Sequence, residues 1–147
     1  MRHTVCALVA AGLIATPALG QEAITYSTDT SVDDVIFAVE SEILAKGLVI
    51  DHVSHVGEML ARTKEDVGGT KDLYTTADVF AFCSATVSRA AMEADPANIR
   101  YCPYTIFVYE RADDPGTTVV GFQDYPDGAM QQVEDMLDEI VTAAIGM

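Results

Sequence analysis

Residues 104–122, YTIFVYERADDPGTTVVGF, decide the fold class of this chain. Residues 104–110 are apolar on both faces of an extended chain, which predicts a central strand of a sheet. The DDPG at 113–116 is a turn signal between antiparallel neighbours, and residues 117–122 form the returning strand. The stretch therefore predicts a strand pair at the centre of a sheet.

Helices and strands alternate before this strand pair. Ser31 and Asp34 approximate a capping box at the start of a helix, and a broad apolar stripe runs from Met130 to Ile145 near the C-terminus. Strands are predicted at 22–29, 48–53 and 79–83, a polar loop at 71–77, and helices at 31–46, 55–67, 84–94 and 127–146. This order predicts an α+β two-layer sandwich, in which one mostly antiparallel or mixed sheet is covered on one side by helices.

The N-terminus has the pattern of a secretory signal peptide. Arg2 supplies a positive charge, residues 5–15 are apolar, and Ala18-Leu19-Gly20 fits a signal peptidase site. We therefore expect residues 1–20 to be cleaved, which removes Cys6 and leaves residues 21–147 as a single domain. The apolar run is shorter than a membrane-spanning helix needs, so the sequence predicts a periplasmic or secreted protein without a membrane span.

Acidic residues dominate the chain, with 23 Asp and Glu against 8 Lys and Arg and a formal net charge of −15. Nucleic acids bind basic patches, so nucleic-acid partners are excluded. An acidic surface most often serves solubility, but it also suits a cationic or metal-bearing partner. Charge alone leaves the partner, a protein or a small molecule, unidentified.

Two cysteines remain after cleavage, in the stretch FCSATVSRAAMEADPANIRYCPY at 82–104. Exported proteins with two cysteines usually pair them, and closing a loop of this size contributes about 3 kcal/mol. If the next strand returns antiparallel, Cys83 and Cys102 meet; if it is parallel, they lie too far apart to bond. We favour the return and a structural disulfide. The alternative is a redox pair, because Cys83 precedes a helix whose N-terminus stabilises a thiolate, while Cys102 precedes Pro103.

Metal binding is a third interpretation of the same region. Cys83, Met92, Cys102, His52 and His55 offer the soft and imidazole ligands that Cu(I) or a haem iron takes, although the spacing matches no zinc motif. Met92 is more often core filler and His52 an ordinary strand residue, so no cofactor is expected.

A pocket near the cysteines is the remaining candidate for a site. His52, Met92, Pro103 and Tyr104 are its candidate residues. Further tyrosines could line it, although sheet tyrosines more often belong to core and rim; they are Tyr101, Tyr109 and Tyr125. The sequence predicts no catalytic residue, because no G-x-S-x-G elbow or phosphate loop is present.

Short motifs resemble those of domain-of-unknown-function family 302. They are Ile-Asp-His at 50–52, Phe-Cys-Ser-Ala at 82–85, Met92, and Cys-Pro-Tyr at 102–104. The resemblance implies a compact α+β fold, often dimeric, with no agreed activity and no catalytic residues. Cys83 and Cys102 stand where that family usually has Gly and Leu, which favours a joint role for the pair.

The sequence thus predicts an exported acidic binding or accessory protein of unknown ligand, with a Cys83–Cys102 disulfide. A periplasmic thiol redox or sulfur-handling protein is the alternative, and copper or haem binding is third.

Overall fold

The computed structural model describes residues 22–147, so the predicted signal peptide lies outside the described residues. The chain forms five strands, four α-helices and one 3-10 helix within this range. In order they are β1 (Ala23–Thr28), α1 (Val32–Ala45), β2 (Val49–His55), α2 (Val56–Thr63), β3 (Tyr74–Cys83), α3 (Ala85–Ala94), η1 (Pro96–Tyr101), β4 (Tyr104–Arg111), β5 (Thr118–Gln123) and α4 (Gln131–Ala144).

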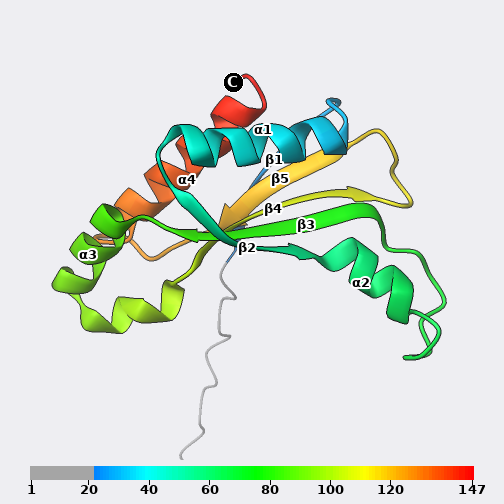
Figure 1. Ribbon diagram of the computed structural model, residues 1–147, viewed down its shortest axis with the longest axis horizontal. Coiled ribbons are helices and arrows are strands. Elements are labelled where there is room, and N and C mark those ends of the chain that lie inside the picture. The colour runs from blue at the N-terminus through cyan, green and yellow to red at the C-terminus, as the bar shows by residue number, and fades with distance from the viewer. Residues whose placement is uncertain (1–21) are drawn as a thin grey trace, which may run out of the picture.

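The five strands form one antiparallel sheet in the order β1-β5-β4-β3-β2. The predicted strand pair, β4 and β5, lies at its centre, with β3 on the other side of β4. Figure 1 shows α1 and α4 side by side over one face of the sheet, and α2 and α3 at its opposite ends. The predicted α+β sandwich with helices covering one face is confirmed.

The hydrophobic core fills the space between the sheet and the two covering helices. Alternate residues of the inner strands, such as Phe80, Ile106 and Phe122, meet the apolar stripes of α1 and α4, and all are nearly inaccessible to solvent. The core therefore lies on one face of the sheet only, and no pair of helices in the described part of the chain covers the second face.

Of the acidic residues of α4, Asp135 and Glu139 are exposed, and Glu139 accepts a hydrogen bond from Lys46 at the end of α1. Glu134 and Asp138 are half-buried and accept hydrogen bonds from the Tyr125 N–H and the Tyr26 hydroxyl.

Several predicted boundaries were wrong, and α2 ends at Thr63 rather than at 67. β3 begins at Tyr74, inside the stretch predicted as a polar loop, because its first residues pair with the end of β4. Residues 96–101, for which neither a helix nor a strand was predicted, form η1, and the Asp95 carboxylate accepts from the Ala97 N–H at its start at 2.9 Å. The last helix begins at Gln131 rather than at 127, after a turn in which Gly128 has a φ of +96°.

No helix within residues 22–147 is both long and apolar enough to span a bilayer.

Candidate functional site

The two cysteines meet at the base of the lobe formed by α3 and η1. Cys83 ends β3 and Cys102 follows η1, and the antiparallel pairing of β3 with β4 places Phe82 opposite Tyr104. This is the expected antiparallel return, and it leaves the Cys83 and Cys102 Sγ atoms 3.5 Å apart. Both are recorded as free thiols and are partly buried, and the Cys102-Pro103 peptide bond is cis.

The surroundings of the pair are apolar and aromatic. Burial, followed by the hydrogen bond and charge of Cys102, raises the pKa of the Cys83 thiol. The Ser88 Oγ lies 3.7 Å from the Cys102 Sγ, and the buried Tyr104 has its pKa raised to about 12, chiefly by desolvation. The causes of this rise in the Cys83 pKa are burial and the neighbouring thiol, whereas a redox role would favour a lowered pKa.

The other candidate ligands are dispersed. His52 is exposed on β2, and within the described residues no hydrogen bond or ion pair joins it to either thiol. Met92 is half-buried on α3, in the last turns of that helix. Residues 22–147 contain no group of three or more His, Cys, Asp or Glu side chains arranged to hold a metal ion. The structure thus brings together only the two cysteines of the predicted set.

Pro103 lines a cavity of about 490 Å³ beside the cysteine pair. The cavity lies between η1 and the adjoining ends of β4 and β5. Its lining residues are Arg100, Tyr101, Pro103, Thr105, Gln123 and Tyr125. Tyr104 is not among them, because it is 1% exposed and belongs to the core. Tyr101 and Tyr125 were predicted as candidates for an aromatic pocket, whereas Arg100, which belongs to no local motif, was not predicted.

The central part of the second face of the sheet carries no Asp, Glu, Lys or Arg side chain. Strand register places 14 residues there; the same face continues at the strand ends to Val49 and Cys83, and to Tyr74 and the charged Arg111. We call these 14 residues the open face: Ala23, Thr25, Ser27, His52, Ser54, Ala77, Val79, Ala81, Thr105, Phe107, Tyr109, Val119, Gly121 and Gln123.

The centre of the open face is flat and aromatic. A Cβ on Gly121 would lie 2.3 Å from the Ile24 carbonyl oxygen and 2.9 Å from the Phe107 ring, so glycine is required there. The missing side chain leaves room for Phe107, whose ring stacks beside Tyr109 at 6.1 Å between centroids. The open face therefore presents aromatic surface in its middle.

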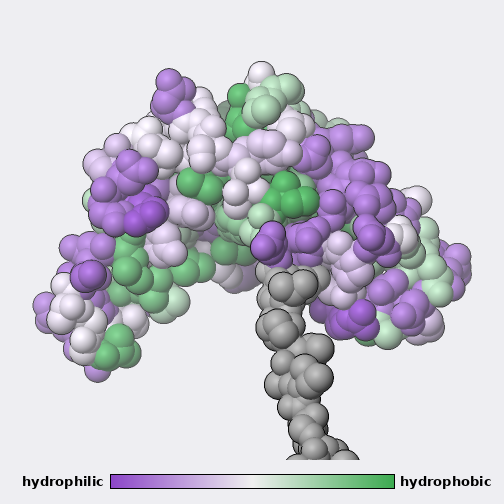
Figure 2. Space-filling view, turned by 180° about the vertical axis from the view of Figure 1, so that it is seen from behind, coloured by the Kyte–Doolittle hydropathy of each residue, from purple (hydrophilic) through white to green (hydrophobic). Residues whose placement is uncertain are grey.

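Helix α2 borders the open face at one end. A Cβ on Gly57 would lie 2.7 Å from the Ala77 backbone nitrogen, so α2 packs directly on β3. A cavity of about 290 Å³ between them is lined by Val56, Val79, Phe107 and neighbouring residues. Figure 2 shows the molecule from behind, with hydrophobic side chains gathered where the projecting region that contains α2 meets the rest of the molecule. Apolar surface thus continues from α2 onto the sheet.

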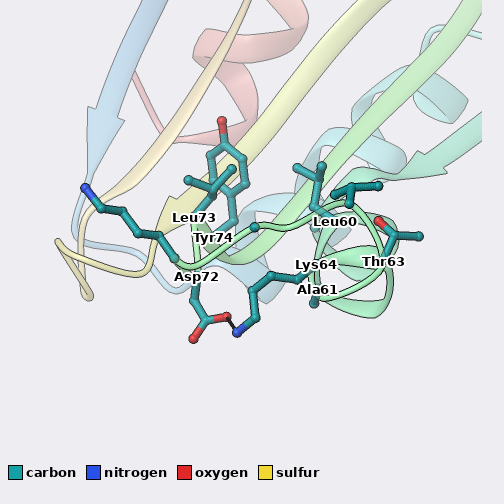
Figure 3. Close-up of a pocket in the computed structure, with 11 residues that line it drawn as sticks. Leu60, Ala61, Thr63, Lys64, Asp72, Leu73 and Tyr74 are labelled. Carbon is teal, nitrogen blue, oxygen red and sulfur yellow. Dashed lines mark hydrogen bonds and ion pairs between the residues drawn. The ribbon is translucent and has the colours of Figure 1, made fainter.

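The loop after α2 folds back along the helix and encloses a smaller hollow of about 130 Å³. Figure 3 shows Leu60 and Thr63 on α2, and Leu73 and Tyr74 on the returning chain. Lys64 donates to Asp72 at 2.7 Å and ties the loop to the helix. The hollow combines this one ion pair with mostly apolar walls, which is typical of a packing junction.

His55 forms an ion pair with Asp78 where β2 runs into α2. The His55 Nδ1 lies 2.9 Å from the Asp78 Oδ1, and the two residues are directly paired across β2 and β3. The hydrogen bond and the charge of Asp78 raise the pKa of His55, with a smaller contribution from Glu58. His55 was predicted as a candidate metal ligand, and its pairing with Asp78 was not predicted.

We expect this ion pair to make stability depend on pH. Because the folded pKa of His55 is raised, its contribution is fully present below the ordinary histidine pKa of about 6.5 and is lost as pH rises through the folded value. NMR titration of the imidazole checks this. Asp78→Asn should lower the His55 pKa and flatten the pH dependence of urea unfolding, whereas unchanged titration in that variant would contradict the assignment.

Comparisons with known proteins agree with this architecture. The family described as "Domain of unknown function DUF302" matches residues 24–145. A crystal structure of an uncharacterized conserved DUF302 protein from Bacillus stearothermophilus is similar with a TM-score of 0.59 and 15% identity, covering 84% of this chain and 93% of that chain. At this identity the likeness concerns the fold alone. No curated protein matches the sequence.

Proposed function

The chain belongs to the DUF302 family, and we propose that it is an exported binding or accessory protein that acts as a homodimer. One observation carries the proposal: the open face is uncharged in a chain with a net charge of −15. If two copies met through the outer surfaces of α1 and α4 instead, the carboxylates of one copy would face those of the other, and their repulsion would oppose association.

A second copy fits the open face by its chemistry. Two sheets pack face to face about 10 Å apart, and interface cores are depleted of charge and enriched in aromatic residues. Phe107 and Tyr109 provide aromatic surface, and Met59 on α2 with Val67 and Leu73 in its loop are exposed hydrophobic residues beside it. The occupant that we assign to the open face is therefore the same face of another copy.

We further propose that Cys83 and Cys102 form a structural disulfide in the exported protein. Their sulfur atoms are 3.5 Å apart, so bonding at about 2.05 Å requires a small approach. The two thiols lose two protons and two electrons to a disulfide-bearing oxidant of the export compartment, whose own disulfide is reduced to two thiols. The raised pKa of Cys83 supports a structural bond over the alternative of a thiol redox protein.

Mass spectrometry of the exported protein tests the compartment and the bond together. We expect a mass that begins at Gln21 and rises by about 2 Da on reduction, because a disulfide has two hydrogen atoms fewer than two thiols. Cys83→Ser is the matched control, which should show no such rise. A full-length mass would contradict the predicted cleavage, and thiols that react with a labelling reagent before reduction would contradict the disulfide.

A further inference from the structure

A cavity next to the cysteine pair has the composition of an anion-binding site. The cavity of about 490 Å³ between η1 and the ends of β4 and β5 is within the usual range for small-molecule sites. Arg100 is the one charged residue among its six lining residues. No carboxylate of the lining competes for that cation.

The guanidinium of Arg100 is held in place by an aromatic ring instead of by an acid. Its carbon lies 4.6 Å from the centroid of the Tyr101 ring, and one nitrogen donates to the Tyr101 hydroxyl at 3.1 Å. Four other cations form ion pairs: Lys46, Lys64, Arg89 and Arg111. Within residues 22–147 Arg100 forms none, as is also true of Arg62 and Lys71, but of these three only Arg100 lines this cavity. Its remaining N–H donors suit a carboxylate, whose two oxygens match the planar guanidinium.

The rest of the cavity suits a planar apolar group. The Tyr101 ring meets Tyr125 edge to face at 5.6 Å, and Tyr125 meets the buried Tyr104 in the same way at 6.2 Å. Pro103 adds a rigid apolar wall, and Thr105 a hydroxyl group. Aromatic edges and faces of this kind pack well against a second ring.

We infer that this cavity binds a small aromatic carboxylate, with Arg100 holding the carboxylate and the tyrosines and Pro103 holding the ring. The inference rests on the proposed binding function and names its ligand class. Cys102 stands between Tyr101 and Pro103 in the chain, so a Cys83–Cys102 bond fixes both walls to the end of β3. The site should therefore be tightest in the oxidised protein.

Calorimetric titration of the oxidised mature protein with benzoate tests the inference, with neutral benzamide as the matched probe. We expect saturable benzoate binding, weaker benzamide binding, and a loss of at least about 10-fold in benzoate affinity in Arg100→Gln, because a charge-assisted bidentate contact is removed. Arg100→Lys should retain part of the affinity. Arg89→Gln, which removes an exposed ion-paired arginine on α3, should retain all of it.

Equal affinity for the two probes, an unchanged Arg100→Gln variant, or no saturation by about 10 mM benzoate would overturn the inference. Thr105 and Gln123 line this cavity and also belong to the open face, so the same titration on the Val79→Asp variant, which is expected to be monomeric, separates the site from the proposed dimer. The mass difference on reduction does not depend on Arg100. An Arg100→Gln protein that remains dimeric and oxidised but still binds benzoate normally would refute the site alone.

Discussion

Replacing Val79 with Asp is expected to convert the proposed homodimer into a monomer. Val79 lies opposite Phe107 in the open face, so a two-fold interface would bury one new carboxylate from each copy. An unpaired buried charge costs several kcal/mol, which corresponds to at least about a 100-fold weaker dimer. Sedimentation velocity over a range of protein concentrations measures the change, and circular dichroism confirms that the variant is folded.

The chain offers a matched control on the opposite side of the molecule. Phe37 is 71% exposed on α1, so Phe37→Asp also replaces a surface hydrophobic residue with an acid. This variant should sediment as the wild-type dimer. Val119→Lys, in β5 of the open face, should dissociate the dimer as Val79→Asp does, since it places the opposite charge in the same interface. Dissociation of Phe37→Asp alone would place the interface on the helical side and contradict the proposal.

Removing the Cys83–Cys102 bond should lower the free energy of unfolding by about 3 kcal/mol, or roughly 10 °C in Tm for a chain of this length. The two cysteines are 19 residues apart in sequence. A bond between them would close a loop in the unfolded chain and so lower its conformational entropy, while the folded topology stays the same. Within the α3–η1 lobe the Asn98 side chain donates to the Ala91 carbonyl at 2.9 Å. The two cysteines stand where this lobe leaves and rejoins the sheet, so a bond between them would hold its two ends together.

Thermal unfolding with and without reductant measures this effect. The double variant Cys83→Ser, Cys102→Ser is the control, because reductant should leave its Tm unchanged while its stability matches that of the reduced wild type. A wild-type protein whose Tm does not respond to reductant, although mass spectrometry shows the bond to be reduced, would rule out a stabilising role for the disulfide.

Local patterns predicted most of the fold, and pairing between strands explains what they missed. The central strand pair followed from residues 104–122, and the capped start of α1 from Ser31, whose hydroxyl accepts from the Asp34 N–H at 3.2 Å. The start of β3 escaped prediction because the stretch is polar and follows Lys71 and Asp72, although its Tyr and Thr residues favour strands. Pairing with β4 extends the strand back to Tyr74.

The candidate site could be predicted only in part. The spacing of Cys83 and Cys102 allowed the pair to meet or to stay apart, and the antiparallel direction of β4 decided between these. The charge-free open face could not be seen in the sequence, because its members come from five strands whose register sets which residues are neighbours. Arg100 was missed because its stacking on Tyr101 depends on η1, a helix that no local pattern predicted.

The central claim is that two copies meet through the open face. An isotope-filtered NOE measurement on a dimer of one labelled and one unlabelled copy tests it most directly, because it detects only contacts between copies. We predict intermolecular NOEs to Val79, Phe107 and Val119 of the open face. Intermolecular NOEs confined to α1 residues such as Phe37 and Leu44, which are exposed on the opposite side, would contradict it.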